Sequence, residues 1–521
     1  MRIFRNGFWQ KLFIIVSLLI ELSLLVYILY QFGSGGLQSP YAIWFLLAFW
    51  LISLFLSIFI INSDSELEYK VSWLFLVGCF PLIGPAFYLL FAHKIKTKKV
   101  KAYTKNYYEL LKEERNQEGL EEKLKEGYPD GYLVANLIEN ASAGRLFTNS
   151  SVSYYPLGDD VFPRMIEELK KAKHYIFLEY FIIKPGYMWD SILEILKEKA
   201  KEGIDVRVIY DDVGNLGATP IRYDKKLRTF GIKAHAYRPI KPFLDVRMNN
   251  RNHRKILVID GHTAFSGGIN LADEYINKEK RFGHWKDNAI MVKGKAVHGF
   301  TLLFLADYET NFAKHNKIVD YESYLPEKYI DEDGGFPISD GFIIPYGDIP
   351  FDEISIGEEV YLSLLSKAKN YVYLSTPYFL PDSKMKDAII RAKLEGVDVR
   401  LLVPHIPDKK LVFELTRKNY GPLLKNGVKI YEYTPGFVHQ KMFVVDDKMA
   451  SIGTINIDYR SLYLHSENST LLIGNKAITH MKNDFLDTFK VSKEITYKEY
   501  KGFRKKKWLL WALLELISPL L

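Results

Sequence analysis

One motif occurs twice in this chain of 521 residues, and the repeat constrains the fold more than any other feature. The pattern H-x-K-x4-D-x6-G-[GST]-x-N extends from His253 to Asn270 and again from His439 to Asn456. Three shorter matches keep the same order at offsets of 193 to 196 residues: 171–175 with 367–371, 202–207 with 395–400, and 231–233 with 427–429. Solenoid units are only about 20 to 50 residues long, so a repeat of this length indicates a duplicated domain.

Segments typical of strands alternate with segments typical of helices around both motifs. Helical patterns at 189–201 and 384–394 separate runs that are typical of strands: 175–183, 206–210, 256–259, 371–374, 399–403 and 442–445. This alternation predicts an α/β fold, with helices packed on sheets. We predict one domain over 151–330 and a similar one over 331–492. Two such halves can pack about a pseudo-twofold axis, which brings equivalent residues face to face.

The N-terminal part is dominated by three apolar segments, at 12–32, 41–61 and 71–91. Each is long enough to span the roughly 30 Å hydrocarbon core of a bilayer as a helix. The third contains Pro81, Gly84 and Pro85, which bend a helix, so it is expected to be a kinked span or a re-entrant hairpin. We therefore predict a helical membrane anchor over residues 1–93, followed by a charged, partly helical linker over 94–150.

The formal charge of +8 is unevenly distributed. Lysine and arginine precede the first apolar segment and follow the third, while the body from 107 to 492 has a formal charge of about −2. Both flanks are thus predicted to be cytoplasmic, which two crossings and a re-entrant third segment would satisfy. The chain is expected in the cell membrane as a multi-pass protein with a cytoplasmic catalytic domain. A nearly neutral body argues against a nucleic-acid partner.

The last segment, 493–521, places a run of basic residues before a Trp-rich and Leu-rich stretch. That stretch is too short to cross a bilayer, but it suits a helix in the headgroup layer beside anionic lipid. Docking of this helix on the protein's own core is the alternative.

The motif also indicates chemistry. A histidine and a lysine two residues apart on a strand share one face, so His253 with Lys255, and His439 with Lys441, would each place an imidazole beside an ammonium group. The lysines, with the amides of Asn270 and Asn456, would bind a phosphate. Two imidazoles that flank a phosphodiester permit a two-step displacement: one attacks phosphorus and forms a covalent phosphoenzyme, and the other protonates the leaving alkoxide.

Carboxylates complete the predicted site. Asp287 and Glu467 each open an apolar strand, 34 and 28 residues after His253 and His439, and are the candidates for orienting the imidazoles. We group the motif aspartates, Asp260 and Asp446, with the catalytic residues, although each precedes a turn and a purely structural role is equally open.

Neither a cofactor nor a metal is expected. The two lysines and two asparagines can offset the transition-state charge, and no further His, Asp or Glu falls at ligand spacing within either motif. Cys79 is the only cysteine, which excludes an intramolecular disulfide and a multi-cysteine metal site.

With these residues the sequence resembles the phospholipase D superfamily, whose signature is the paired H-x-K-x4-D motif. Within that superfamily it resembles the bacterial cardiolipin synthases. The resemblance covers nearly the whole chain. It includes Tyr210 to Asp212, Asn249 to His253, Asp273 to Tyr275, Ser375 to Tyr378, Asp458 to Ser461, the residues Trp73, Pro81, Gly84 and Tyr88, and the basic C-terminus. The chain departs from two-span relatives by an added apolar segment, which affects only the expected topology.

The resemblance implies that two phosphatidylglycerol molecules yield cardiolipin and glycerol through a phosphohistidine intermediate. By similarity, His253 would be the nucleophile and His439 the acid, whereas the symmetry of the motifs does not assign these roles. A phospholipase D-type hydrolase or another phosphatidyltransferase would use the same residues, and a nuclease of the superfamily would require a basic groove. Acceptor specificity and oligomeric state leave no mark in the sequence.

Overall fold

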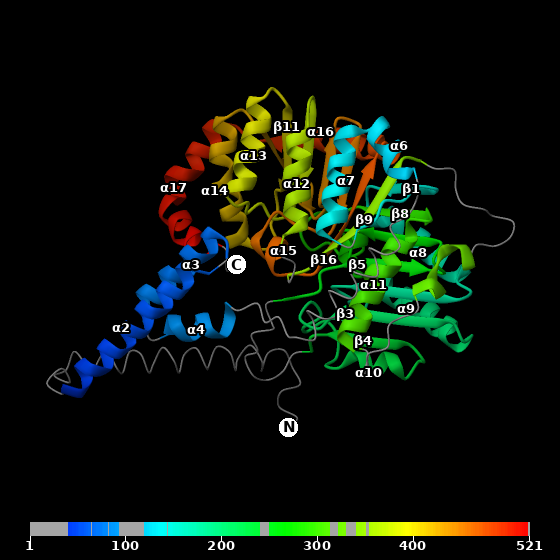
Figure 1. Cartoon of the computed structure of the whole chain (residues 1–521), viewed down its shortest axis with the longest axis horizontal. Coiled ribbons are helices and arrows are strands. Elements are labelled where there is room, and N and C mark those ends of the chain that lie inside the picture. The colour runs from blue at the N-terminus through cyan, green and yellow to red at the C-terminus, as the bar shows by residue number, and fades with distance from the viewer. Residues whose placement is uncertain are drawn as a thin grey trace.

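The computed structural model describes residues 40–63, 65–81, 83–92, 119–142, 144–239, 250–312, 321–329, 340–350 and 354–518. Two β-sheets, one from each half of the chain, form the body of the molecule, and helices cover them (Figure 1). The predicted mixed α/β fold with two sheet-containing halves is therefore confirmed.

The first sheet has seven strands in the order β1-β8-β6-β5-β2-β3-β4. The strands are β1 (Ser150–Tyr155), β2 (Tyr175–Tyr180), β3 (Asp205–Asp211), β4 (Lys233–Tyr237), β5 (Lys255–Ile259), β6 (Thr263–Gly267) and β8 (Ala289–Gly294). Strands β2, β3 and β4 are parallel because helices connect them, and β5, β6 and β8 run antiparallel. β2 and β5 are buried along their whole length, as expected of central strands covered on both faces.

The second sheet has eight strands in the order β17-β12-β11-β10-β14-β15-β16-β9. They are β9 (Phe342–Asp348), β10 (Tyr371–Ser375), β11 (Asp398–Pro404), β12 (Lys429–Tyr433), β14 (Met442–Val445), β15 (Met449–Gly453), β16 (Glu467–Ile473) and β17 (Ser492–Glu494). Apart from β17, the order repeats that of the first sheet strand for strand. The duplication read from the motifs is thus a duplication of the whole sheet.

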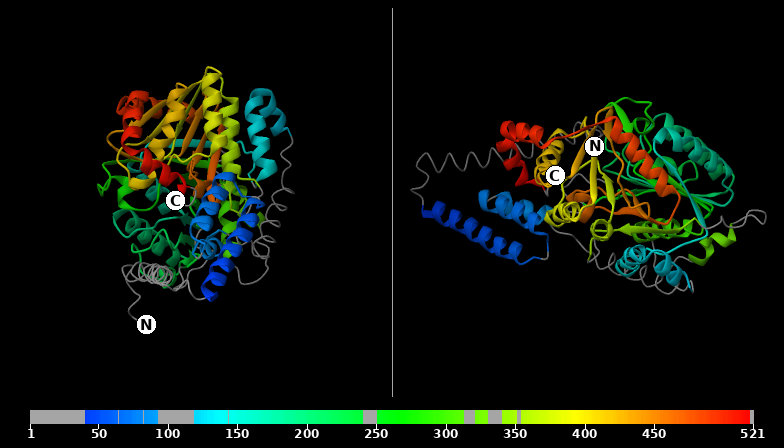
Figure 2. Two further views of the ribbon diagram at one scale, coloured as in Figure 1. Left: turned by 90° about the vertical axis from the view of Figure 1, so that its left-hand side faces the viewer. Right: turned by 90° about the horizontal axis from the view of Figure 1, so that it is seen from above.

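Helices lie on both faces of each sheet. The helices within the two halves are α8 (Gly158–Lys171), α9 (Tyr187–Lys201), α10 (Tyr223–Arg228), α11 (Val297–Phe312), α12 (Ile356–Lys367), α13 (Ser383–Leu394), α14 (Lys410–Lys425), α15 (Tyr459–Tyr463) and α16 (Ala477–Lys490). Short 3-10 helices lie at Asp273–Ile276, Tyr321–Tyr324 and Pro326–Lys328. α8 and α9 pack on the outer face of the first sheet, and α12, α13 and α14 on that of the second (Figures 1 and 2).

A shared core joins the halves. α11 and α16 contribute Phe300, Phe304 and Phe485 to one buried cluster that also contains Phe177 of the first sheet and Tyr373 of the second. Two short strands, β7 (His284–Lys286) and β13 (Gly436–Val438), pair in parallel across the halves. The two domains therefore form one continuous hydrophobic unit.

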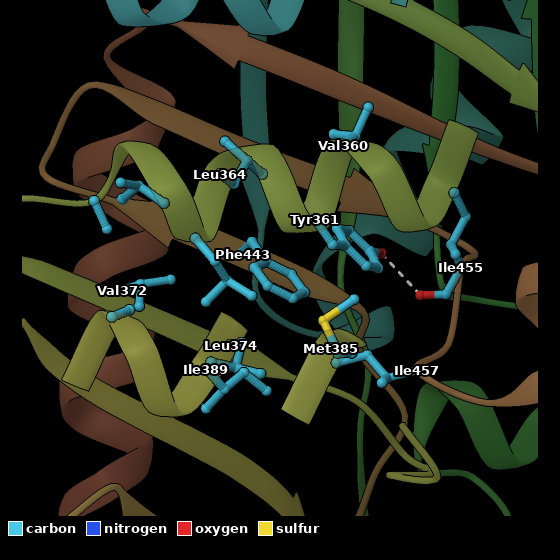
Figure 3. Close-up of a cluster of buried hydrophobic side chains, with 14 of the residues drawn as sticks. Val360, Tyr361, Leu364, Val372, Leu374, Met385, Ile389, Phe443, Ile455 and Ile457 are labelled. Carbon is cyan, nitrogen blue, oxygen red and sulfur yellow. Dashed lines mark hydrogen bonds between the residues drawn. The ribbon is translucent and has the colours of Figure 1, made fainter. Parts of the chain in front are cut away.

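The outer core of the second half shows how α12 is held (Figure 3). Tyr361 stacks on Phe443 with ring centroids 4.1 Å apart, and its hydroxyl donates to the carbonyl of Ile455 at 2.8 Å. Met385 and Ile389 of α13 close the cluster from the side. Ile455 belongs to the second motif, so this packing fixes the loop that follows β15.

Part of the segment interpreted as a linker is core instead. α6 (Leu120–Gly127) and α7 (Pro129–Ala141) bury Leu124, Val134 and Ile138 in the same cluster as α12. Their apolar positions recur at helical spacing, and they face the second sheet although they precede the first in sequence. The description of 94–150 as a charged linker is therefore wrong for 120–141, and 94–118 lies outside the described residues.

The N-terminal helices α2 (Pro40–Ile61), α3 (Leu67–Cys79) and α4 (Ile83–Phe91) pack together beside the second half (Figure 1). Tyr69 of α3 stacks on Tyr459 at 4.9 Å, which attaches this group to the body. Among the described helices, none has the combined length and hydropathy that a membrane crossing requires. Segment 12–32 lies outside the described residues. Segment 71–91 is broken between α3 and α4, where Pro81 lies, whereas Gly84 and Pro85 belong to the first turn of α4.

The C-terminal helix α17 (Tyr497–Glu515) has two different faces. One face docks on α14, where the Trp511 indole and Lys507 contact Glu414. The other leaves Trp508 62% and Leu513 57% exposed. Docking on the core, the alternative left open by the sequence, therefore accounts for one face only.

Candidate active site

The two motif histidines lie at the interface of the halves and are held there by backbone hydrogen bonds. The amide of His253, just before β5, donates to the carbonyl of Ser466 at 2.8 Å, and the amide of His439, just before β14, donates to Lys286 at 2.8 Å. Each partner is the residue before a predicted orienting carboxylate. The same backbone contact thus occurs twice, in the crossed manner expected of two halves related by a twofold axis.

The carboxylates follow the same crossed arrangement. Nδ1 of His253 lies 2.8 Å from Oε2 of Glu467, and Nδ1 of His439 lies 2.6 Å from Oδ2 of Asp287. Their sequence spacing relates each carboxylate to the histidine of its own half, but in the structure each imidazole pairs with the carboxylate of the other half. An ionised carboxylate only accepts hydrogen bonds, so both Nδ1 atoms carry hydrogen, and in a neutral imidazole Nε2 then carries the lone pair. The arrangement leaves Nε2 of each imidazole for chemistry.

Burial keeps both imidazoles neutral in the free protein. Together with the neighbouring lysines, and against the opposing effect of Glu467 and Asp287, it lowers the pKa of His253 to about 3 and that of His439 to about 4. A phosphodiester anion placed between the imidazoles would oppose this effect, because a negative charge favours the imidazolium. The site is therefore arranged to gain a proton when an anion binds.

The motif lysines are the positive charges of the site. Lys255 and Lys441 are at most 1% exposed, and burial lowers the pKa of Lys255 to about 7 and that of Lys441 to about 8. Nζ of Lys255 donates to the carbonyl of His253 at 2.7 Å. Nζ of Lys441 lies 3.1 Å from Nε2 of His439. It also lies 2.9 Å from Nδ1 of the same ring and donates to the carbonyl of His439. Both lysines thus contact the backbone carbonyl of their own histidine, and Lys441 in addition lies against its imidazole ring.

The orienting carboxylates differ in their surroundings. Glu467 also accepts hydrogen bonds from the hydroxyls of Thr454 and Ser461. Burial alone would raise the pKa of Glu467, but the neighbouring His253 and His465 hold it well below the usual range of a glutamate. At the position equivalent to Thr454 stands Gly268, where a Cβ atom would collide with Asp287. The two half-sites are therefore chemically unequal.

The motif asparagines occupy less direct positions. Nδ2 of Asn270 donates to the hydroxyl of Tyr275 at 2.7 Å, and Tyr275 packs edge-on against His439 at 5.5 Å. Oδ1 of Asn456 is buried, with no hydrogen-bond partner in the described part of the chain. Phosphate binding by these two amides stays a prediction.

The contacts of the motif aspartates favour a structural role over a catalytic one. Asp260 accepts hydrogen bonds from three consecutive amides at 173–175, and Asp446 does the same at 369–371, with distances of 2.6 to 2.8 Å. Both have a positive φ, which aspartate tolerates in turns. Each follows its motif lysine by five residues, roughly 17 Å along a strand. Their grouping with the catalytic residues is corrected accordingly: they anchor the start of the central strands β2 and β10.

A third histidine, which the motifs did not reveal, also lies at the site. The ring of His465 lies 5.8 Å from that of His253, and its Nδ1 lies 3.8 Å from Oε1 of Glu467. These three residues could hold a metal ion, since their ligand atoms lie within 4.8 Å of one another. The adjacent lysines and the hydroxyls already bound to Glu467 disfavour a cation, so the site fits an anion better. Aligning the two halves on their carboxylates would have revealed His465, because it stands opposite Trp285.

The family of the chain follows from a match that covers both halves. The family model described as "Cardiolipin synthase, PLD-like domain" matches residues 165–301 and 361–488, about half of the chain. The chain belongs to this family. Both matched ranges include an H-x-K-x4-D motif, and together they supply both imidazoles and both orienting carboxylates.

Individual relatives extend the similarity beyond the two domains. A protein from Streptococcus mutans described as uncharacterized is 40% identical over 89% of this chain and 99% of its own length. A cardiolipin synthase from Alkalihalophilus pseudofirmus is 33% identical over 94% of this chain and 96% of its own, and one from Halalkalibacterium halodurans is 32% identical over 98% and 100%. The match to the Halalkalibacterium halodurans protein leaves only 2% of this chain uncovered, so it includes most of the N-terminal apolar region as well as the two halves.

One solved structure supports the fold. The phosphatidylserine synthase of Haemophilus influenzae superposes with a TM-score of 0.56 over 75% of this chain and 100% of that chain, at 15% sequence identity. At that identity the likeness concerns the fold alone.

Proposed function

We propose that the chain is a cardiolipin synthase, which transfers the phosphatidyl group of one phosphatidylglycerol molecule to a headgroup hydroxyl of a second and releases glycerol. The observation that carries the proposal is the pair of crossed imidazole–carboxylate contacts, His253 with Glu467 and His439 with Asp287, beside two buried lysines. Full-length similarity to cardiolipin synthases supports this activity over hydrolysis or another phosphatidyl transfer.

In the first step Nε2 of His253 attacks phosphorus, a P–N bond forms, and the P–O bond to the glycerol headgroup breaks. The departing alkoxide takes a proton from Nε2 of His439. This division of roles is the one that the family resemblance implies. It agrees with the contacts of the nucleophile, because Nε2 of His253 has no ammonium neighbour among its recorded contacts and its lone pair is open for attack, whereas Nζ of Lys441 lies 3.1 Å from Nε2 of His439. Lys255 and Lys441 offset the negative charge that develops on phosphorus.

In the second step the acceptor hydroxyl loses its proton to the now neutral His439. Its oxygen attacks phosphorus, and the P–N bond to His253 breaks. His439 is then protonated again, as in the substrate complex, and the proton that was taken up when the anionic substrate bound leaves the site with the anionic product. No cofactor or metal is needed for the balance. Asn270 and Asn456 are proposed to help bind the phosphate, and Asp287 and Glu467 to keep each Nε2 directed at phosphorus.

Product analysis tests the activity. Purified full-length protein, incubated with phosphatidylglycerol vesicles, should yield cardiolipin and glycerol in equal amounts, measured by mass spectrometry of the lipids and an enzymatic glycerol assay. Phosphatidic acid as the main product would instead show a hydrolase. A matched reaction with phosphatidylcholine as sole lipid should give no cardiolipin.

The finer membrane arrangement belongs to the same proposal. We propose that the segments 12–32, 41–61 and 71–91 anchor the chain in the cell membrane, with the domains 151–330 and 331–492 on the cytoplasmic side. The exposure of Trp44 (68%) and Phe55 (72%) on α2 supports contact with lipid, because apolar side chains of this size are costly to leave in water. Anionic lipid would bind the basic part of the 493–521 segment.

A dye attached near the C-terminus would detect lipid contact. In a Cys79→Ser background, a solvent-sensitive dye on Leu509→Cys of α17 should shift to shorter wavelength when the protein is moved from detergent into phosphatidylglycerol vesicles. The same dye on Leu394→Cys, also exposed but at the end of α13, should not shift. Equal spectra at the two positions would contradict the proposed orientation of α17.

A further inference from the structure

Two aromatic residues occupy equivalent positions in the half-sites. Trp285 stands two residues before Asp287, and His465 stands two residues before Glu467. Each ring packs against the imidazole that its neighbouring carboxylate orients: Trp285 lies 5.6 Å from His439 at 44°, and His465 lies 5.8 Å from His253 at 46°. The pseudo-symmetry therefore places an aromatic ring beside each reactive imidazole.

The ring nitrogens at both positions are buried and form no hydrogen bond within the described part of the chain. Nδ1 and Nε2 of His465 and Nε1 of Trp285 have no hydrogen-bond partner among the described residues. The nearest carboxylate oxygen to His465, on Glu467, is 3.8 Å away, beyond hydrogen-bond distance. Buried polar groups without partners are uncommon, and within an active site the missing partner is often the substrate. The side chain of His465 is 14% exposed and that of His253 is 9% exposed, so both are about equally accessible to a ligand.

The two rings differ in what they can bind. An indole N–H only donates a hydrogen bond, whereas a neutral imidazole has one donor and one acceptor. Phosphate oxygens only accept, but an alcohol hydroxyl both donates and accepts. Trp285 therefore suits a phosphate oxygen, and His465 suits a hydroxyl. Because His465 lies beside His253, that hydroxyl would be close to the reacting phosphorus.

We propose that His465 binds a hydroxyl of the glycerol headgroup next to the reacting phosphorus and thereby makes the site selective for polyol headgroups. This inference rests on the proposed phosphatidyl transfer and names its specificity-determining residue. Glycerol units are present both in the leaving group and in the acceptor, so the same contact would serve both steps. An acceptor that lacks the second hydroxyl would leave His465 unpaired, and such a mismatch is strongly selected against in polar sites.

A competition between two acceptors tests the inference. The full-length protein is given phosphatidylglycerol with equal concentrations of deuterated glycerol and 1-propanol, and the ratio of labelled phosphatidylglycerol to phosphatidylpropanol is measured by mass spectrometry. The wild type should favour glycerol, and His465→Phe should lower this ratio at least about tenfold. Both products come from one sample, so a smaller folded fraction does not change the ratio.

Three further variants make the test specific. His465→Gln keeps a donor and an acceptor and should stay within about threefold of the wild-type ratio. Trp285→Phe should slow both products alike and leave the ratio unchanged. His480→Phe makes the same exchange on the exposed surface of α16 and should change nothing. If His465→Phe is inactive, the ratio is read in His465→Ala instead.

The outcomes separate this inference from the proposed function. A wild-type protein that transfers phosphatidyl groups, together with an unchanged ratio in His465→Phe or His465→Ala, would overturn the role of His465 alone. A wild-type protein that forms neither product and no cardiolipin would overturn the proposed function and this inference with it.

Discussion

Replacing His253 or His439 by alanine should lower the rate of cardiolipin formation by at least about 10³-fold. His253→Ala removes the nitrogen that forms the P–N bond, and His439→Ala removes the proton donor for an alkoxide that leaves poorly without one. The loss of rate is expected to be large for both variants, because formation and breakdown of the phosphohistidine are consecutive steps and each must occur in every turnover. Cardiolipin formed from phosphatidylglycerol vesicles, followed by mass spectrometry, measures the loss.

The double variant gives this prediction a sharper form. Both histidines act in the same pathway, so removing the second one costs little once the first is gone. The rate of the double variant should therefore stay within about tenfold of the rate of the slower single variant. His480→Ala, on the exposed surface of α16, is the matched control and should keep wild-type activity. Near-normal turnover by either single variant would refute a mechanism with two histidines.

The fold was predictable to the extent that the two halves repeat local patterns. The apolar run at 256–259 and its equivalent at 442–445 predict central strands, and both form buried strands of their sheets. The role of α7 was not predictable, because its apolar face identifies a core position without identifying the sheet that it covers. Its charged neighbourhood in sequence favoured a linker, and packing against α12 outweighed that signal.

The site was predictable in its components but not in its pairing. The residue types and the strand positions of Asp287 and Glu467 indicated orienting carboxylates. Which imidazole each one orients depends on how the halves meet, and a spacing counted within one half contains no information about that contact. His465 was not predictable for a similar reason: its significance comes from its proximity to His253, which is 212 positions away in the sequence.

The crossed pairing predicts that replacing the two carboxylates has opposite effects on the first step when the leaving group needs no proton. In a substrate whose glycerol is replaced by p-nitrophenol, the first step depends on His253 and no longer on His439. Glu467→Gln removes the carboxylate partner of His253. This variant should therefore release the first equivalent of p-nitrophenol about 10² to 10⁴-fold more slowly. Asp287→Asn should keep the burst within about tenfold, and absorbance in a stopped-flow experiment measures both.

With phosphatidylglycerol as substrate, both variants should lose cardiolipin formation to a similar extent, because His439 is then needed as acid and base. Asp287→Asn should also stop after one p-nitrophenol per enzyme molecule, since deprotonation of the acceptor requires an oriented His439. Asparagine and glutamine match the size of the residues they replace, so the comparison isolates the charge. Pairing within each half would reverse the two bursts, with Asp287→Asn losing its burst and Glu467→Gln keeping it, and that result would contradict the crossed arrangement.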